Sequence, residues 1–266
     1  IKGVYVLPKI GVIMTSFPNR LIAIFVALMF LSGCLSDSEN EDIENKLPCG
    51  EKIILSYEEL AQNTSAPSIV ANVRYFDNVA NLNDVLIFTE PVNGSLSMID
   101  LPCEDECRET IISSDSFAAP VRVDVADLDA DGVGELIVAD IGILFPSNSQ
   151  VGKVIILDYN EQSGEFTEDV AIKNIGRVTC AEAVDLDSDG DLDLTLCEFG
   201  DDNGSVGWLE NNGDQGWVHH EIDNRSGSIV ALSGDFDNDG DQDIVSVISQ
   251  LTEEVTMYWN DGEGNF

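Results

Sequence analysis

Basic residues are scarce in this sequence. Lysine and arginine together number 12 against 50 aspartates and glutamates, which gives a formal net charge of −38 and an isoelectric point near 4.1. Nucleic-acid binding depends on cations that neutralise phosphates, so this balance excludes a nucleic-acid partner. Other polyanions are disfavoured as ligands unless a metal ion bridges them. The 44% of hydrophobic residues is still enough for a folded core.

Residues and motifs that carry catalysis are scarce as well. The two histidines, His219 and His220, are neighbours in a segment that is expected to form a strand, so their side chains point to opposite faces. The sequence has no G-x-S-x-G elbow, no HExxH helix and no phosphate-binding loop. We therefore assign no catalytic residue and predict that the chain is not an enzyme.

Acidic residues, in contrast, are concentrated in three copies of one pattern: "DLDADGVGEL" from Asp127, "DLDSDGDLDL" from Asp185 and "DFDNDGDQDI" from Asp235. Each copy has acids at the first, third, fifth and ninth positions and glycine at the sixth. Carboxylates this close repel one another unless they point into water or share a cation. Glycine permits the sharp turn that brings them together, and hard oxygen ligands on a flexible loop suit Ca²⁺ better than Mg²⁺. A solvated acidic turn is the alternative for one copy, whereas three copies in one register favour metal.

The expected ligands share the same positions in each copy. The side-chain ligands are Asp127, Asp129, Asp131 and Glu135, then Asp185, Asp187, Asp189 and Asp193, and finally Asp235, Asp237, Asp239 and Asp243. The seventh position adds a backbone carbonyl, from Val133, Asp191 and Asp241. An EF-hand is excluded because it needs glutamate at the twelfth position, where these copies have valine, leucine and serine. The sequence thus predicts about three structural calcium ions.

Short β-branched runs flank each acidic pattern, for example "VRVDVA" and "ELIVAD", so each pattern is expected to join two strands of a hairpin. A second strand pair around a Gly/Asn turn follows each hairpin. The patterns begin at residues 127, 185 and 235, a period of 50 to 58 residues that indicates stacked units. Four antiparallel strands per unit make a propeller blade. The prediction is an all-β fold with about four visible blades, the first of which lacks the acids of a metal loop.

Over about residues 70 to 266 the chain resembles the FG-GAP repeat family, also described as VCBS-type repeats. The resemblance depends on the three D-x-D-x-D-G-x-x-[DE] loops and on the "WLENNGD" and "YWNDGEGNF" turns. It implies a β-propeller, usually seven-bladed, with structural calcium between the first and second strands. The chain is then expected to be a fragment of such a ring, and a small ring closed by "EKIILSYEEL" is the alternative. Trp208 and Trp259 occupy positions that look equivalent in two repeats, which favours core packing over sugar stacking.

The N-terminus has the pattern of a targeting segment. Residues 1–33 are expected to be a signal peptide that begins at Met14, with an apolar core, "LIAIFVALMF", too short for a membrane-spanning helix. "LSGC" resembles a bacterial lipobox, which implies cleavage before Cys34 and lipidation of its sulfur; an ordinary secretory signal or a membrane helix is the alternative. Residues 34–50 are expected to be a flexible acidic tether and residues 51–266 the repeat domain. We therefore expect export to the cell envelope, at the outer membrane or cell surface, with the lipid as the only membrane contact.

The six cysteines suit an oxidising compartment. Cys103 with Cys107, and Cys180 with Cys197, are the expected disulfides, and isolated buried thiols are the alternative. Cys49 then has no expected partner in this sequence.

Recognition is expected at the end of the blades opposite the calcium loops. The candidates there are Phe145, Arg177, Asp201, Asp202 and Arg225, and ordinary solvated loop residues are the alternative for each. The leading hypothesis is a calcium-stabilised, lipid-anchored surface propeller that acts as a binding or adhesion scaffold for a protein or glycan. The alternative is a carbohydrate-active enzyme, similar to a polysaccharide lyase, with catalytic residues in further blades. A pure assembly module stays open as well, since fold alone does not give function.

Overall fold

The computed structural model describes residues 73–76, 79, 84–101, 109–113, 115–160, 162–250 and 253–266, together with 4–5 and 14–15 near the start. The chain divides into two compact units, Ile1–Gln62 and Asn63–Phe266. In the first unit β1 (Val4–Tyr5) pairs antiparallel with β2 (Met14–Thr15). The expected signal peptide otherwise lies outside the described residues, as do Cys34 and the tether. Within the described residues, no helix is long and apolar enough to cross a membrane.

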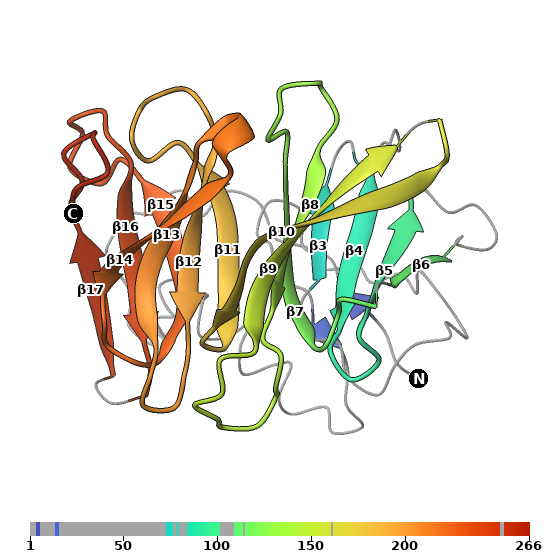
Figure 1. Cartoon of the computed structure of the whole chain (residues 1–266), viewed down its shortest axis with the longest axis horizontal. Coiled ribbons are helices and arrows are strands. Elements are labelled where there is room, and N and C mark those ends of the chain that lie inside the picture. The colour runs from blue at the N-terminus through green and yellow to red at the C-terminus, as the bar shows by residue number, and fades with distance from the viewer. Residues whose placement is uncertain are drawn as a thin grey trace, which may run out of the picture. The chain divides into compact units, whose positions relative to one another are not determined.

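The second unit consists of four antiparallel sheets that follow one another in chain order, from the right to the left of Figure 1. The first sheet contains β3 (Val73–Phe76), β4 (Val85–Glu90), β5 (Ser95–Asp100) and β6 (Glu109–Ser113). The second contains β7 (Pro120–Ala126), β8 (Glu135–Asp140), β9 (Gly152–Asn160) and β10 (Glu165–Ile175). The third contains β11 (Val178–Val184), β12 (Asp193–Glu198), β13 (Ser205–Asn211) and β14 (Trp217–Asp223). The fourth contains β15 (Ser228–Gly234), β16 (Asp243–Ile248) and β17 (Glu254–Tyr258).

Each sheet has the up-and-down strand order of a propeller blade, because neighbours in the sequence are neighbours in the sheet. The second strands β8 (ELIVAD) and β12 (DLTLCE) are buried along their whole length, including the acids at both of their ends. The fourth strand β10 is largely exposed, as expected for the outer edge of a blade. The predicted all-β fold of propeller-type blades is confirmed, and the described blades do not close a ring.

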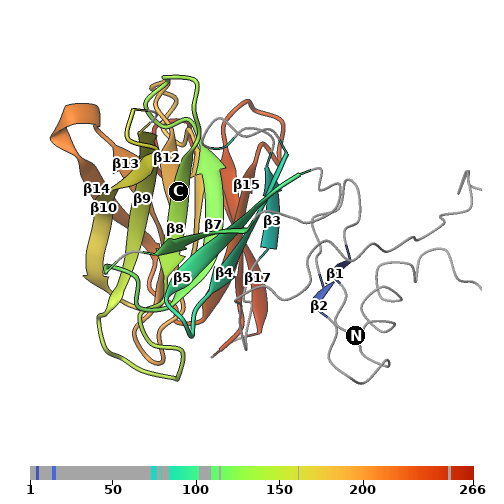
Figure 2. The same ribbon diagram turned by 90° about the vertical axis from the view of Figure 1, so that its right-hand side faces the viewer.

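The core of this unit lies between successive sheets, where both faces are apolar. Side chains of the first and second sheets form one cluster, those of the second and third a second cluster, and those of the third and fourth a third cluster. Figure 2, turned so that the first sheet is nearest the viewer, shows the sheets one behind another. Fully buried members include Ile87, Leu136, Ile137, Leu194, Leu196 and Ile244. Packing one sheet on the next fixes the positions of the loops at the sheet ends.

The prediction that Trp259 packs in the core is wrong. Trp208 is buried, but the side chain of Trp259 is 51% exposed. The strand register also shows that the two tryptophans are not equivalent: Leu194 pairs with Leu209, and Ile244 pairs with Tyr258. Trp259 is therefore the structural counterpart of Glu210, two places after Trp208.

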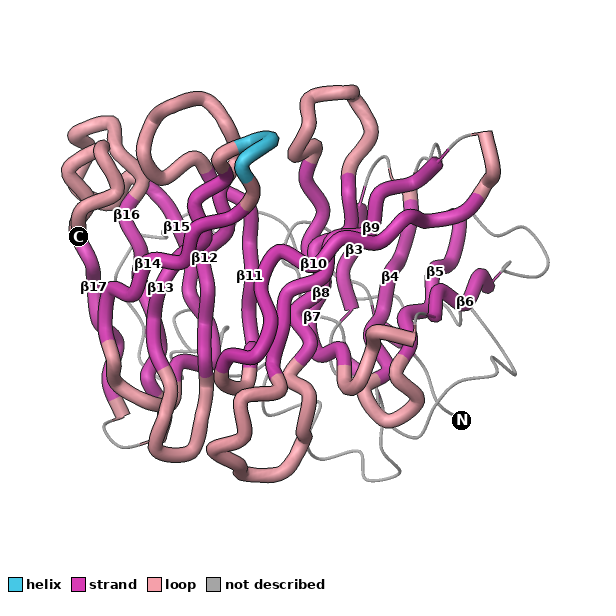
Figure 3. The backbone as a smooth tube through the Cα atoms, in the orientation of Figure 1, coloured by secondary structure: helices cyan, strands magenta, loops and turns pink. Residues whose placement is uncertain are grey.

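The loops gather at the two ends of the strands (Figure 3). Because strands alternate in direction, the loops after the first and third strands of every sheet share one end. The short helix η1 (Gly213–Gln215), which follows the third strand β13, lies at this end, at the top of Figure 3. The loops after the second strands lie at the opposite end.

Candidate metal centres

Three loops join the first and second strands of the second, third and fourth sheets. We name residues 127–135 acidic loop 1, residues 185–193 acidic loop 2 and residues 235–243 acidic loop 3. Their sixth residues, all glycine, have φ angles of 93°, 101° and 106°. Their fourth residues, Ala130, Ser188 and Asn238, also lie in the left-handed region, at 60°, 60° and 64°. The three loops therefore share one backbone turn, and the left-handed fourth position is a feature that the glycine pattern did not reveal.

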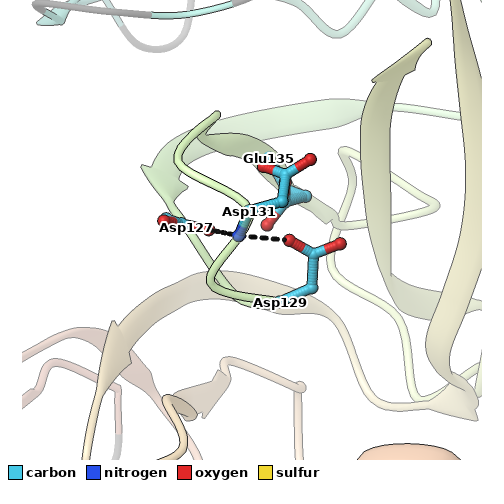
Figure 4. A group of neighbouring side chains, drawn as sticks. All are labelled: Asp127, Asp129, Asp131 and Glu135. Carbon is cyan, nitrogen blue, oxygen red and sulfur yellow. Dashed lines mark hydrogen bonds between the residues drawn. The ribbon is translucent and has the colours of Figure 1, made fainter.

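This turn directs the acids of acidic loop 1 toward a common point (Figure 4). The backbone N–H of Asp131 donates to Asp127 Oδ1 at 3.0 Å and to Asp129 Oδ1 at 3.1 Å. One carboxylate oxygen from each of Asp127, Asp129, Asp131 and Glu135 lies within 4.8 Å of the others. All four predicted side-chain ligands of this loop thus converge.

The other two acidic loops each bring three of the four predicted side chains together. Asp185, Asp187 and Asp193 converge in acidic loop 2, and Asp235, Asp237 and Asp239 converge in acidic loop 3, by the same 4.8 Å measure. Asp189 and Asp243 were predicted as ligands but lie outside these groups. Asp189 accepts the N–H of Asp191 at 2.9 Å. Ligation by the carbonyls of Val133, Asp191 and Asp241 stays a prediction.

The ninth residue of each acidic loop is buried and has a second role that the sequence pattern did not show. Its carboxylate accepts the backbone N–H of the loop's second residue and so closes the loop. The three bonds are Leu128 N to Glu135 Oε2 at 2.6 Å, Leu186 N to Asp193 Oδ2 at 2.9 Å and Phe236 N to Asp243 Oδ2 at 3.1 Å. This residue belongs both to the second strand and to the loop, so the strand positions the acids.

The electrostatics of these buried acids favour a cation. Burial, with added repulsion from Asp129, Asp158 and Asp127, raises the pKa of Glu135 to about 7, although the N–H of Leu128 opposes the rise. Burial likewise raises the pKa of Asp193 to about 6. A bound cation would stabilise the ionised forms of both groups.

Two carboxylate oxygens of the acidic loops are buried without a hydrogen-bond partner, Glu135 Oε1 and Asp185 Oδ1. An unpartnered buried oxygen is unfavourable in a folded protein, and a metal ion would satisfy it. The donors are carboxylate oxygens, which suit a hard cation such as Ca²⁺ rather than a softer metal. The residues present therefore fit such an ion.

Two further acids, which the repeated acidic pattern did not indicate, lie on the third strands: Asp158 on β9 and Glu210 on β13. Asp158 helps to raise the pKa of Glu135, and Glu210 adds to the effect of burial and of Asp189 in raising the pKa of Asp187. Asp158 and Glu210 occupy equivalent positions, one residue after the leucines that pair with the second strands. An alignment of the third strands would have revealed this common position.

At the opposite end of the sheets, Arg177 is buried rather than exposed. Its Nε and Nη2 donate to the carbonyls of Ile143 and Leu144, each at 3.0 Å, and its guanidinium lies over the ring of Phe199 at 5.3 Å from the centroid. Burial lowers the pKa of Arg177. This residue holds the loop after β8 in place, and Phe145, the next residue of that loop, is 79% exposed.

The predicted recognition residues Asp201 and Asp202 link neighbouring loops at the same end. Asp202 bonds to Asn148 twice, through its N–H at 2.7 Å and its Oδ2 at 3.0 Å. Asp201 Oδ1 accepts from Gln250 Nε2 at 3.0 Å. The loops after β8, β12 and β16 therefore form one connected surface.

Arg225 lies between the outer strands of the third and fourth sheets and is fully engaged. Its guanidinium pairs with Asp223 and with Glu254, and it reaches the hydroxyl of Tyr258 at 3.3 Å. Hydrogen bonds from Arg225 and Tyr258 lower the pKa of Asp223 to about 2. Burial and the bond to Asp223 raise the pKa of Tyr258 to about 12. This arrangement connects the third and fourth sheets through Arg225.

Cys180 on β11 and Cys197 on β12 form a disulfide, as expected from the sequence. They are directly opposite each other in the strand register, at the end of the hairpin remote from acidic loop 2. Cys103 and Cys107, the other expected pair, lie outside the described residues.

A family model of the FG-GAP-like repeat matches residues 185–246. The matched segment begins with acidic loop 2 and extends through acidic loop 3 into β16. No curated protein matches the chain. Together with the four stacked sheets, the FG-GAP-like match over residues 185–246 indicates a scaffold of the propeller type.

Proposed function

We propose that this chain is a calcium-stabilised surface scaffold that binds a protein or glycan and acts in adhesion. The observation that carries the proposal is the repetition of one loop geometry three times, with converging carboxylates in each copy. The acidic residue types of these loops would, by themselves, also be compatible with a turn whose carboxylates point into water. A buried, unpartnered oxygen of Glu135 within the cluster favours an ion instead.

The acidic loops use the ion for structure. A bound calcium ion supplies positive charge that offsets the repulsion among the carboxylates. The chain's own contribution is the left-handed turn and the ninth-position acid, which hold the ligands at the start of the second strand. Calcium at millimolar concentration outside the cell is sufficient for loops of the weaker extracellular kind.

Thermal unfolding of the full chain with calcium and with a chelator tests this proposal. We expect calcium to raise the melting temperature by several degrees, since a ligand at about 10 times its Kd stabilises by about 1.4 kcal/mol per site. Magnesium at the same concentration is the matched control and should have a much smaller effect. D187A and D237A should each reduce the calcium-dependent rise. An unchanged melting temperature with calcium would refute calcium binding.

We place the recognition surface at the end opposite the acidic loops. Support comes from the exposed Phe145, which sits on a loop whose backbone is fixed by Arg177, because a rigid exposed aromatic is a good anchor for a partner. Binding to glycan arrays and to cells would be compared for wild type, F145A and S163A, the last from a loop at the other end. A loss in F145A alone supports the surface, and equal binding of all three refutes it.

Export and attachment through a lipid at Cys34 complete the proposal. The support is the signal-like sequence and the disulfide between Cys180 and Cys197, which suits an oxidising compartment. Mass spectrometry of the N-terminal peptide from a bacterial host tests it: the wild type should carry a diacylglyceryl group that C34S lacks.

A binding role is favoured over a carbohydrate-active enzyme. The close approach of Arg225 and Tyr258 is the arrangement that a lyase would require, but both residues are committed to Asp223. The raised pKa of Tyr258 also makes it a poor proton acceptor at neutral pH. Incubation with acidic polysaccharides, monitored for unsaturated products, should give no turnover above background.

A further inference from the structure

Asn260 connects acidic loop 3 to acidic loop 2 of the preceding sheet. It lies two residues after the end of β17 and is 5% exposed. Its backbone N–H donates to Asp243 Oδ1 at 2.9 Å, and its Nδ2 donates to Gln242 O at 3.0 Å, so it holds acidic loop 3. The same Nδ2 donates to Leu186 O at 2.6 Å, across the boundary between the sheets. A single side-chain amide therefore holds the backbone of two acidic loops.

Leu186 is the residue through which this contact reaches acidic loop 2. It lies between the converging acids Asp185 and Asp187, and its side chain is fully buried. Its carbonyl is held by Asn260, and its N–H is held by Asp193 Oδ2 at 2.9 Å. Any displacement of Leu186 would move both neighbouring carboxylates, so Asn260 controls how well they are placed.

Asn211 provides an internal comparison, because it occupies the position in the third sheet that Asn260 occupies in the fourth. Its N–H donates to Asp193 Oδ1 at 2.9 Å, its Nδ2 donates to Leu192 O at 3.2 Å, and its Oδ1 accepts from Gly213 N at 3.1 Å. These match the local bonds of Asn260. Among the described residues, Asn211 makes no bond to acidic loop 1 of the sheet before it. The two asparagines thus share their local bonds and differ in the bond between loops.

We propose that Asn260 is a positioning residue that couples calcium binding at acidic loop 2 to calcium binding at acidic loop 3; this rests on the calcium binding proposed above. An ion held by Asp235 and Asp237 restrains Phe236 between them, whose N–H donates to Asp243 Oδ2 at 3.1 Å. Asp243 Oδ1 accepts the N–H of Asn260, which then holds Leu186 in place. Acidic loop 2 has less conformational freedom left to lose when it binds its own ion, so its affinity rises. Linkage makes the effect reciprocal. Among the described residues no such bond joins acidic loop 1 to another acidic loop, so acidic loop 1 is expected to bind its ion independently.

The test is a calcium chloride titration of the full chain followed by NMR. The amide signals of Gly132, Gly190 and Gly240, the sixth residues of the three acidic loops, report each loop separately. D237N disables acidic loop 3, and the effect on the affinity of acidic loop 2 is measured in the wild-type, N260A and N211A backgrounds. N260S, whose side chain is too short to reach Leu186, replaces N260A if that variant does not fold.

We expect D237N to weaken calcium binding at Gly190 by at least about fivefold in the wild-type and N211A backgrounds. In the N260A background D237N should leave the Gly190 affinity unchanged, and the Gly132 affinity should be constant throughout. Loss of coupling in N211A as well as N260A would overturn the proposal, as would equal coupling in all three backgrounds or none in the wild type. These outcomes differ from failure of the proposed function itself, in which none of the three glycine signals responds to calcium.

Discussion

Replacing Glu135 by glutamine is expected to stabilise the protein without calcium and to weaken its response to calcium. Glu135 is 4% exposed, and its Oε1 has no hydrogen-bond partner. Burial, together with the charges of Asp129, Asp158 and Asp127, raises its pKa from 4.5 to about 7. A shift of this size corresponds to a penalty of about 3 kcal/mol on the folded state with an ionised Glu135.

The direction of the pH dependence is set by which state, folded or unfolded, holds the Glu135 proton more tightly. Without calcium the folded state holds the Glu135 proton up to a pKa of about 7, whereas the unfolded chain releases it near 4.5. The stability of the calcium-free wild type therefore falls as pH rises through this window, and the loss is complete above it. Glutamine does not ionise. E135Q should exceed the wild type by about 3 kcal/mol at pH 8, or about 5–10 °C in melting temperature, and by little near pH 4.5.

Calcium should reverse this advantage. The ion satisfies the ionised Glu135 and removes the penalty, whereas E135Q has lost one of the four converging carboxylates. Differential scanning calorimetry at pH 8, with EGTA and with millimolar calcium, measures both effects. The rise in melting temperature on adding calcium should be clearly smaller for E135Q than for the wild type.

E198Q is the matched control. Glu198 is also a buried acid at one end of a second strand, but at the end opposite the acidic loops, and it accepts hydrogen bonds from Gly176 N at 2.6 Å and Ser205 Oγ at 2.8 Å. Its replacement should destabilise the protein equally with and without calcium. The reasoning fails if E135Q is less stable than the wild type in EGTA at pH 8, or if both respond equally to calcium.

Three further outcomes are expected. A130G should raise the free energy of unfolding in urea by about 0.5–1 kcal/mol, because Ala130 is held at a φ of 60°, which glycine adopts without strain. A lower stability of A130G would show that the backbone at Ala130 is not strained. R225A should lose about 1–3 kcal/mol of unfolding free energy at pH 7. This deficit should shrink as pH falls from 3.8 through about 2, where Asp223 becomes protonated. A deficit that does not change with pH would contradict the ion pair between Arg225 and Asp223. Replacing Cys180 and Cys197 by alanine should lower stability by about 3 kcal/mol relative to the oxidised wild type, as expected for a separation of 17 residues. Calorimetry measures the loss, and the reduced wild type should be as stable as the variant.

Much of the fold could be predicted from the sequence because the repeat constrains it. Apolar runs on both sides of each acidic loop determine a hairpin, and three hairpins at a regular period determine stacked sheets. The disulfide followed from the same argument, since Cys180 and Cys197 lie at matched distances from acidic loop 2. Patterns of this kind can be recognised within one stretch of sequence, without knowing which other segments pack against it.

Features that depend on contacts between segments could not be predicted. The burial of Arg177 depends on where the carbonyls of Ile143 and Leu144 lie, which no local pattern gives. That Trp259 is the counterpart of Glu210 and not of Trp208 depends on a register that the Gly/Asn turns obscure. The bond from Asn260 to Leu186 joins residues 74 positions apart. The sequence around Asn260 resembles the sequence around Asn211. The roles of the two asparagines differ because of the way one sheet packs on another.

The hairpin formed by β11 and β12 is closed at both ends, by acidic loop 2 at one end and by the Cys180–Cys197 disulfide at the other. An antiparallel hairpin under tension normally opens from its free end, one hydrogen bond at a time. Here the free end is covalently joined, so a pull on β11 against β12 is borne by the sulfur–sulfur bond. If the chain is the tethered scaffold proposed above, this hairpin would resist opening when the protein is pulled.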